Sequence, residues 1–393
     1  MRDVVITAAR RTPIGKFMGG LSSMSAADLG AAVVPAALLD AGLAPTSVDE
    51  LIFGCGRQAG GGPNIARQVA IRSGLPISST AVTLNMACGS GLLAMIEGRN
   101  SIQRGESDIV VVGGTESMSR LPYYLEEARG GYRLGHGQLV DGMYRDGFHC
   151  PLADQLMGAT AENLVEEFDI SRDEQDAYAV ESQRRCEVAQ SEGRFAAEII
   201  PIEIKGRKGP TIVDSDEHPR PGANLASMQK LKPVFREGGS VHPGNSSGIT
   251  DGAAALVLAS EGVAKDLGMP ILARVGSSSR AGVEPERMGI GPVPAVRKLL
   301  ERTGRTLADY DLVELNEAFA AQVIACDREL KLDREKLNVN GGAIALGHPI
   351  GATGARIVVT LLHELRRRGG GLGLATLCIS GGQGLALEIV VNG

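Results

Sequence analysis

Long apolar runs are missing from this chain of 393 residues. The longest, at 109–112 and 357–362, are far shorter than the roughly 20 residues that cross a bilayer, so no membrane span is predicted. Residues 1–6 contain no apolar or Arg- and Ser-rich leader, which favours a protein that stays in the cytoplasm. An excess of basic charge is missing too. The net charge of −6 argues against a general nucleic-acid-binding protein.

Metal and redox motifs are also missing. The six cysteines form no CxxC pair, and no His follows them at zinc-finger spacing. In a long chain without a secretory leader this pattern favours reduced thiols over a disulfide framework. The sequence contains no P-loop, no HExxH motif and no complete GxGxxG loop. We therefore predict no metal and no redox cofactor.

What the chain does contain is an alternation of strand-like and helical segments, which predicts an α/β protein. The hydrophobic content of 43% is enough for a large core and for two or three domain-sized units. The expected strands and helices are, in chain order, a strand at 4–7, a helix at 26–41, strands at 50–53, 108–112 and 311–315, a helix at 353–368 and a strand at 372–379.

The two ends of the chain resemble each other in the order of these elements. Residues 47–54 have a counterpart in 309–316, and the helix expected after Cys88 has a counterpart after His348. We therefore expect two similar α/β halves, residues 1–120 completed by about 246–270, and residues 271–393. Residues 121–245 lack this regular alternation and are predicted to form a long, functional insertion.

Cys88 is a candidate nucleophile. It lies between a strand-like segment at 82–84 and the start of a predicted buried helix, and glycines flank it. A thiol at a helix N-terminus is expected to have a lowered pKa, because the helix dipole and free N–H groups favour the thiolate. A structural cysteine at a tight helix–strand contact would show the same glycines, so Cys88 taken alone leaves both interpretations open.

His348 and Cys378 are the other two reactive side chains in glycine-rich segments. His348 lies in a Gly- and Pro-containing turn ahead of an amphipathic helix, where it could accept a proton from a thiol or donate to an oxyanion. Cys378 closes a strand before the segment 381–384. Each is more often structural when it occurs singly, but equivalent ends of two similar halves can meet at one pocket.

The combination of these segments closely resembles the thiolase family over essentially the whole chain. The matching motifs are the segments around Cys88, at 244–248, 251–255, 288–295, 316–321 and 338–349, and around Cys378. This resemblance implies the thiolase-like fold, in which two pseudo-symmetric α/β halves form a layered α-β-α-β-α core. It also implies an inserted loop domain at 121–245 that binds CoA and supports tetramers, and an assembly as a homodimer or homotetramer.

The same resemblance implies a ping-pong acyl transfer between CoA thioesters, with no further cofactor. Cys88 would carry the acyl group, His348 would remove its proton, and Cys378 would exchange a proton with the α-carbon. One oxyanion site would use His348 and a water held by Asn316. The other would use the backbone N–H groups of Cys88 and Ser380.

The resemblance to the thiolase family also implies which residues contact the substrate and CoA. Ser247 resembles the pantetheine contact, and Arg220 and Ser227 fall where the family meets the nucleotide end of CoA. A local excess of Lys and Arg at 205–236 suits phosphates, although a solvated surface would show it too. The residues that resemble the acyl pocket are Leu156, Met157, Phe235, Met288, Ala318 and Phe319.

Two positions depart from the family pattern. Ser380 stands where the family usually has Gly, which keeps the N–H but adds a side chain. Leu156 stands where short-chain biosynthetic thiolases commonly carry His, and it favours 3-oxoacyl chains longer than four carbons. A ketosynthase or hydroxymethylglutaryl-CoA synthase on the same fold is the alternative enzyme; ketosynthases lack a counterpart of Cys378. A thiolase-like lipid-binding protein without catalysis is the non-enzymatic alternative.

Overall fold

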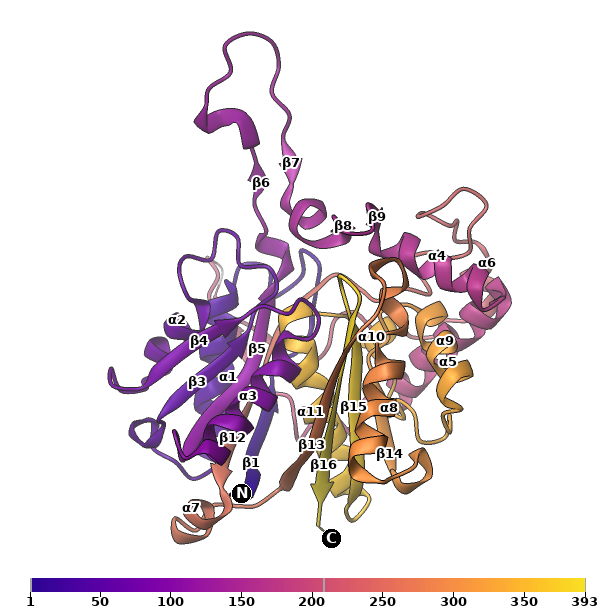
Figure 1. Ribbon diagram of the computed structural model, residues 1–393. Coiled ribbons are helices and arrows are strands. Elements are labelled where there is room, and N and C mark those ends of the chain that lie inside the picture. Colours follow the sequence, from indigo (N-terminus) through magenta and orange to yellow (C-terminus); the bar gives the residue numbers. More distant parts are fainter. Residues whose placement is uncertain (1, 208, 393) are drawn as a thin grey trace.

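The computed structural model describes residues 2–207 and 209–392 (Figure 1). Ten strands form one sheet in the order β14-β15-β16-β13-β1-β12-β5-β3-β4, and a short β2 (Gly15–Lys16) pairs with β12. The sheet joins two halves at one place, where Val5 pairs with Arg274 and Ile6 pairs with Ala273. No helix among the described residues is both long and apolar enough to cross a membrane.

The N-terminal half of the sheet consists of five strands. Antiparallel pairs join β1 to β12 and β12 to β5, whereas β5, β3 and β4 run parallel to one another. Their bounds are Val4–Arg11 for β1, Glu50–Gly54 for β3, Thr80–Leu84 for β4, Ile109–Ser117 for β5 and Thr250–Ser260 for β12.

The C-terminal half repeats this order. Antiparallel pairs join β13 to β16 and β16 to β15, and β14 runs parallel to β15. A parallel bridge from Val313 to Leu337 takes the place that β4 has in the other half. The bounds are Ala273–Gly282 for β13, Leu312–Leu315 for β14, Gly371–Ile379 for β15 and Gln383–Val391 for β16. The predicted pseudo-symmetry of the two halves is confirmed.

Helices separate and cover the two halves in layers. Helices α3 (Ser90–Arg104) and α11 (Ile350–Arg367) share one apolar core with strands of both halves. Helices α1 (Ala26–Asp40) and α2 (Ile65–Arg72) cover the outer face of the first half, and α8 (Pro292–Thr303) and α9 (Ala320–Leu330) cover that of the second (Figure 1). This is the predicted α-β-α-β-α arrangement.

The two central helices approach each other through glycines. A Cβ atom on Gly91 would lie 2.8 Å from the backbone nitrogen of Ala355, and one on Gly354 would lie 2.2 Å from that of Leu92. Larger residues at these two positions would push the helices apart. Because α3 begins just after Cys88 and α11 just after His348, this close packing brings the two reactive segments to the same end of the core.

The insertion contains helices α4 (Met157–Glu167), α5 (Arg172–Ser191) and α6 (Leu225–Gln229), which lie beside the C-terminal half. Its hairpins pair β6 (Tyr123–Tyr124) with β7 (Val140–Asp141), β8 (His149–Cys150) with β9 (Gln155–Leu156), and β10 (Ile202–Ile204) with β11 (Thr211–Val213). The arm that β6 and β7 begin projects away from the core (Figure 1). The two remaining α-helices of the described residues are short: α7 (Glu261–Asp266) and α10 (Ala343–Leu346).

Candidate active site

Cys88 lies in a tight turn between β4 and α3, as predicted. Ala87 has the left-handed φ of 44°, and Asn85 Oδ1 accepts from its backbone N–H at 3.0 Å. Ser90 Oγ accepts from the backbone nitrogen of Met86 at 2.9 Å and donates to the carbonyl of Ala87 at 2.7 Å. These side-chain bonds hold an uncommon backbone conformation and fix the position of the Cys88 thiol.

The prediction that the pKa of Cys88 is lowered is wrong. Burial raises the pKa of this thiol above its ordinary value. The charge of Arg57 and the N–H groups of Ser380 and Cys88, which hydrogen-bond the sulfur, offset only part of that rise. A helix terminus contributes about 1 kcal/mol at most sites, which is less than the cost of burying a thiolate. The resting thiol is therefore protonated and needs a base.

His348 is suited to be that base. Its Nδ1 lies 2.6 Å from Thr353 Oγ1, and the Thr353 hydroxyl donates its own proton to the carbonyl of Pro349 at 2.9 Å. Nδ1 must therefore carry the ring proton, which leaves Nε2 as an acceptor. Nε2 is buried and has no hydrogen-bond partner among the described residues. Burial, with the nearby charges of Arg356 and Arg57, lowers the pKa of His348 to about 3, so the imidazole is neutral.

The segment before His348 depends on one glycine. Gly347 has a φ of 100°, and a Cβ atom there would lie 2.3 Å from Thr250 Cγ2. Both the conformation and the contact exclude a side chain. The backbone nitrogen of His348 donates to the carbonyl of Gly248 at 3.0 Å, which ties the turn to the neighbouring loop.

Cys378 is buried near the end of β15, and the three-residue turn 380–382 follows it into β16. Gly381 and Gly382 both have positive φ, near 87° and 86°. Burial raises the pKa of Cys378 well above its ordinary value, and the charge that Cys88 carries as a thiolate raises it further. The two cysteine segments meet, since a Cβ atom on Gly89 would lie 2.6 Å from Ile379 Cδ1, and Cys378 is held as a proton-bearing thiol.

Asn316 follows β14 at the same end of the sheet. Its amide oxygen and nitrogen are both buried and have no hydrogen-bond partner among residues 2–207 and 209–392. The carboxylate of the neighbouring Glu317, by contrast, accepts hydrogen bonds from Tyr178 at 2.9 Å, Ser182 at 2.7 Å and Asn338 at 3.0 Å. Glu317 therefore fixes the loop while Asn316 keeps polar atoms free for a water or substrate.

An apolar wall surrounds Cys378. Phe235 and Phe319 meet edge to face with ring centroids 6.1 Å apart, and the Phe235 ring packs so closely on Gly158 that no Cβ atom would fit there. The cluster unites five of the predicted pocket residues with Cys378, namely Met157, Phe235, Met288, Ala318 and Phe319. Such a wall suits an acyl chain next to the thiol.

Ser247 lies in a loop that links the Asn316 and His348 segments. Its backbone nitrogen donates to the carbonyl of Ala318 at 2.9 Å, and the next residue, Gly248, accepts from the His348 backbone nitrogen. The Asn316 segment and the His348 segment are therefore held by consecutive residues of one loop. This places Ser247 at the junction, as expected for a substrate contact.

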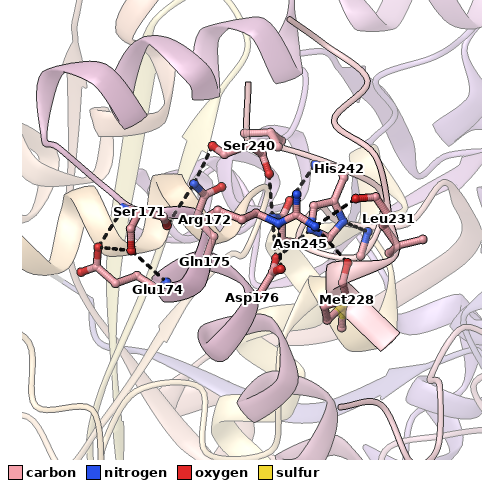
Figure 2. A network of polar contacts seen from close by, with 12 residues as sticks. Ser171, Arg172, Glu174, Gln175, Asp176, Met228, Leu231, Ser240, His242 and Asn245 are labelled. Atoms are coloured by element: carbon pink, nitrogen blue, oxygen red, sulfur yellow. Dashed lines mark hydrogen bonds and ion pairs between the residues drawn. The ribbon is translucent and has the colours of Figure 1, made fainter. Parts of the chain in front are cut away.

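A buried polar network on α5 fixes the start of that loop (Figure 2). Asp176 accepts from His242 Nε2 at 2.7 Å and from Asn245 Nδ2 at 3.1 Å, and Gln175 donates to Ser240 at 2.8 Å. The backbone nitrogen of Gly244 donates to His242 Nδ1 at 3.0 Å, so a neutral ring satisfies both its nitrogens. Burial lowers the pKa of His242 in agreement, although Asp176 opposes the shift.

The remaining predicted contacts lie on the insertion. Arg220 and Ser227 are exposed, and Ser227 completes the N-terminal cap of α6 with Asn224. Leu156 is half-buried at the end of β9, where it pairs across the hairpin with His149. These positions leave Arg220 and Ser227 open to a large polar ligand and put Leu156 directly before Met157 of the apolar wall.

Sequence reasoning missed Glu116, which ties the loop after β3 to the helix that follows His348. This buried carboxylate accepts from the backbone nitrogens of Gly56 at 2.9 Å, Arg57 at 3.1 Å and Gly351 at 2.9 Å. It thus joins the loop after β3 to the first turn of α11, where an anion is favoured by the helix dipole. A carboxylate four residues after the apolar run 109–112, on the same strand, was the signal available in the sequence.

Two interacting thiols, a neutral imidazole with one free nitrogen and convergent N–H groups define a thiol-dependent acyl-transfer site. Comparisons with known proteins agree. The family model of the thiolase N-terminal domain matches residues 4–262, and that of the thiolase C-terminal domain matches residues 269–391. The chain belongs to the thiolase family.

Relatives and solved structures resemble the chain over its full length. It is 52% identical to an acetyl-CoA acetyltransferase of Pseudomonas aeruginosa and 50% identical to one of Cupriavidus necator, with 99% of each chain covered in both cases. The structure of the Bacillus anthracis acetyl-CoA acetyltransferase matches with a TM-score of 0.98 and 47% identity, over 100% of this chain and 99% of that one. Human mitochondrial 3-ketoacyl-CoA thiolase in complex with CoA matches with a TM-score of 0.96 and 43% identity, over 100% and 98%.

Proposed function

We propose that this chain is an acetyl-CoA C-acyltransferase that catalyses the reversible thiolytic cleavage and Claisen condensation of 3-oxoacyl-CoA. The relatives named acetyl-CoA acetyltransferase, at about half identity over the whole chain, support this activity. The observation that carries it is the state of His348, whose Nδ1 is held by Thr353 and whose Nε2 is free, at a site with two interacting thiols.

In the cleavage direction the Cys88 sulfur attacks the 3-oxo carbon as its proton passes to His348 Nε2. The bond between the α-carbon and the 3-oxo carbon then breaks, the acyl group stays on Cys88 as a thioester, and the electron pair goes to the α-carbon. Cys378 donates the proton that converts this enolate into acetyl-CoA. Its raised pKa suits a thiol that holds its proton until the enolate forms.

In the second half-reaction the thiol of a new CoA passes its proton to the Cys378 thiolate and attacks the Cys88 thioester. The Cys88 sulfur leaves and takes back the proton held by His348, which restores the starting state of all three residues. The backbone N–H groups of Cys88 and Ser380 act to lower the pKa of the Cys88 thiol, which supports a role for both as donors to the oxyanion. Removing one such donor typically costs about 3 kcal/mol of transition-state stabilisation. The unpartnered amide of Asn316 suits the water of the other oxyanion site.

CoA is the proposed carrier of both substrates. The human 3-ketoacyl-CoA thiolase of the same fold was solved with CoA, which supports a CoA site here. Ser247 would contact pantetheine, while the exposed Arg220 and Ser227 would meet the nucleotide end. The metabolite ratio, rather than any residue, decides whether cleavage or condensation prevails.

The two alternatives are less well supported. A ketosynthase-type condensing enzyme needs no thiol at Cys378, yet this buried sulfur interacts with Cys88. A lipid-binding protein without catalysis would have no need of unpartnered polar atoms on both Asn316 and His348, since each costs stability unless it has a function.

Assembly as a homotetramer is part of the proposal. The projecting arm exposes Leu134 at 99% and Leu139 at 64%, which favours contact with another copy. The edge strand β4 also exposes Val82 and offers unpaired backbone for a dimer. Light scattering would show a tetramer, and removal of residues 126–139 would leave dimers. A wild-type monomer would contradict this proposal. The cytoplasmic location and the absence of a cofactor stay predictions.

A thiolysis assay tests the activity. Loss of the enolate absorbance of 3-oxoacyl-CoA would be followed after CoA is added, over chain lengths of four, six and eight carbons. We expect rapid CoA-dependent loss with the wild type and almost none with His348→Asn. Stoichiometric binding of 3-oxoacyl-CoA without turnover would instead favour the lipid-binding alternative.

A further inference from the structure

A buried cation lies beside the nucleophile without an ion pair. Arg57 follows β3 and is only 7% exposed. Among the residues that the structure describes, its guanidinium forms no direct ion pair, although its charge acts on the nearby Glu116 carboxylate, and its Nε is buried without a hydrogen-bond partner. Burying an unpaired charge is costly, so its retention calls for a compensating interaction.

The contacts of Arg57 place it against the turn that carries Cys88. One guanidinium nitrogen donates to the carbonyl of Gly56 at 3.4 Å, and Asn85, three residues before Cys88, donates to the same carbonyl at 3.3 Å. The backbone nitrogen of Arg57 is held by Glu116. From the other side Gly147 of the insertion packs so closely that a Cβ atom there would lie 2.6 Å from Arg57 Nε.

We propose that Arg57 is a positioning residue for the nucleophile, in which the buried guanidinium stabilises negative charge on the Cys88 sulfur. The inference rests on the proposed function only in taking Cys88 as the nucleophile. The loop after β3, the Cys88 turn and the insertion together hold the cation in place. The thiolate is then a second anion for this cation, in addition to the Glu116 carboxylate.

The charges at the site agree with this role. Arg57 acts to lower the pKa of Cys88, whereas Glu116 acts to raise it. Arg57 and Arg356 both act to lower the pKa of His348, which keeps the base unprotonated. Two further thiols, Cys378 and Cys55, are held neutral because burial raises the pKa of each well above its ordinary value, and Glu116 raises that of Cys55 further. Loss of the cation should therefore raise the pKa of the Cys88 thiol and move the onset of Cys88 reactivity to higher pH, while the His348 imidazole stays neutral in this range.

Alkylation kinetics test the proposal without any CoA substrate. The rate at which iodoacetamide labels Cys88, located by peptide mass spectrometry, would be measured against pH in the wild type, Arg57→Leu, Arg57→Gln and Arg57→Lys. We expect the half-maximal rate to move up by about one pH unit or more in the two neutral variants and to stay near the wild-type value in Arg57→Lys. Circular dichroism selects the variants that fold.

Arg99→Leu is the matched control, because Arg99 is a partly buried arginine on α3 whose charge does not act on Cys88. Its profile should match that of the wild type. A folded Arg57→Leu or Arg57→Gln variant with the wild-type profile would overturn the proposal. Since labelling needs no acyl transfer, a shifted profile in a protein without thiolysis activity would contradict the proposed function and leave the role of Arg57 standing.

Discussion

Thr353 determines which nitrogen of His348 can act as a base. The Nδ1 atom lies 2.6 Å from the Thr353 hydroxyl oxygen, and that hydroxyl donates to the carbonyl of Pro349 one helical turn earlier. The hydroxyl can therefore only accept from Nδ1, which leaves the lone pair on Nε2 at the site. The Thr353 side chain on α11 thus sets the His348 tautomer that is needed for catalysis.

Replacing this hydroxyl should slow the chemical step. Thr353→Val keeps the shape but removes the acceptor, so the imidazole would lose its preferred tautomer. We expect kcat for thiolysis to fall by roughly tenfold or more with KM little changed. Thr353→Ser, which keeps the hydroxyl, should retain most of the activity. An unchanged kcat in Thr353→Val would show that Thr353 does not set the tautomer.

Cys378 should be needed for carbon–carbon bond chemistry but not for the first acylation by acetyl-CoA. The Cys378→Ala variant should still take an acetyl group on Cys88, because that step uses His348. Its thiolysis and condensation rates should fall by about 10² or more. Cys186→Ala removes a buried thiol that packs against α10 rather than in the cluster around Cys378, and it serves as the control. Near-normal turnover in Cys378→Ala would refute the role of this thiol.

Leu156 should favour 3-oxoacyl chains longer than four carbons. It directly precedes Met157 of the apolar wall, and each further buried methylene of the substrate can gain about 0.8 kcal/mol. Leu156→His should shift the ratio of kcat/KM values toward the four-carbon substrate over six and eight carbons. Ile212→His adds an exposed imidazole on β11 and should leave the ratio unchanged.

The position of His149 sharpens this test, because it pairs directly across the hairpin from Leu156. Opposite residues of an antiparallel pair have side chains on the same face, so His149 can offer an imidazole close to the position of Leu156. His149→Leu should therefore weaken any remaining activity on the four-carbon substrate more than on longer ones. A wild type confined to four carbons, or a ratio indifferent to Leu156→His, would show that Leu156 does not control chain length.

The buried His348 should also make stability depend on pH. Its pKa is about 3 in the folded protein, against about 6.5 in the unfolded chain. Between these values the unfolded chain binds a proton that the folded protein does not, so stability falls as pH decreases from about 6.5 toward 3. At pH 5 the expected loss is about 2 kcal/mol relative to pH 7.5. Denaturation of the wild type and His348→Asn at both pH values measures it; an equal loss in both would exclude His348 as the cause.

The sequence was sufficient where a local pattern decides the structure. The periodicity at 26–41 predicted α1 to within one residue, and the small residues around Cys88, His348 and Cys378 identified the reactive segments. The α11 helix begins earlier than the expected residue 353, at Ile350, because Pro349 can precede a helix but not continue it. The strand β16 was not predicted, since its partners β13 and β15 are fixed only by tertiary pairing.

The electrostatics of the site could not be predicted in the same way. The helix start at Ser90 suggested a low pKa for Cys88, but the degree of burial, which depends on the whole fold, reversed the sign. Glu116 binds Gly56, which is 60 positions away in the sequence, and Gly351, which is 235 positions away. No local sequence pattern can predict such contacts. The pairing of His149 with Leu156 likewise depends on hairpin register rather than on residue type.

The acyl-enzyme on Cys88 is the central claim, and intact-mass spectrometry tests it most directly. After mixing with acetyl-CoA the wild type should gain the mass of one acetyl group, which peptide mapping places on Cys88 and which added CoA removes. Cys88→Ser should lose the adduct or form it far more slowly, whereas Cys326→Ser should behave as the wild type. An adduct that persists unchanged in Cys88→Ser and maps to another cysteine would contradict the account.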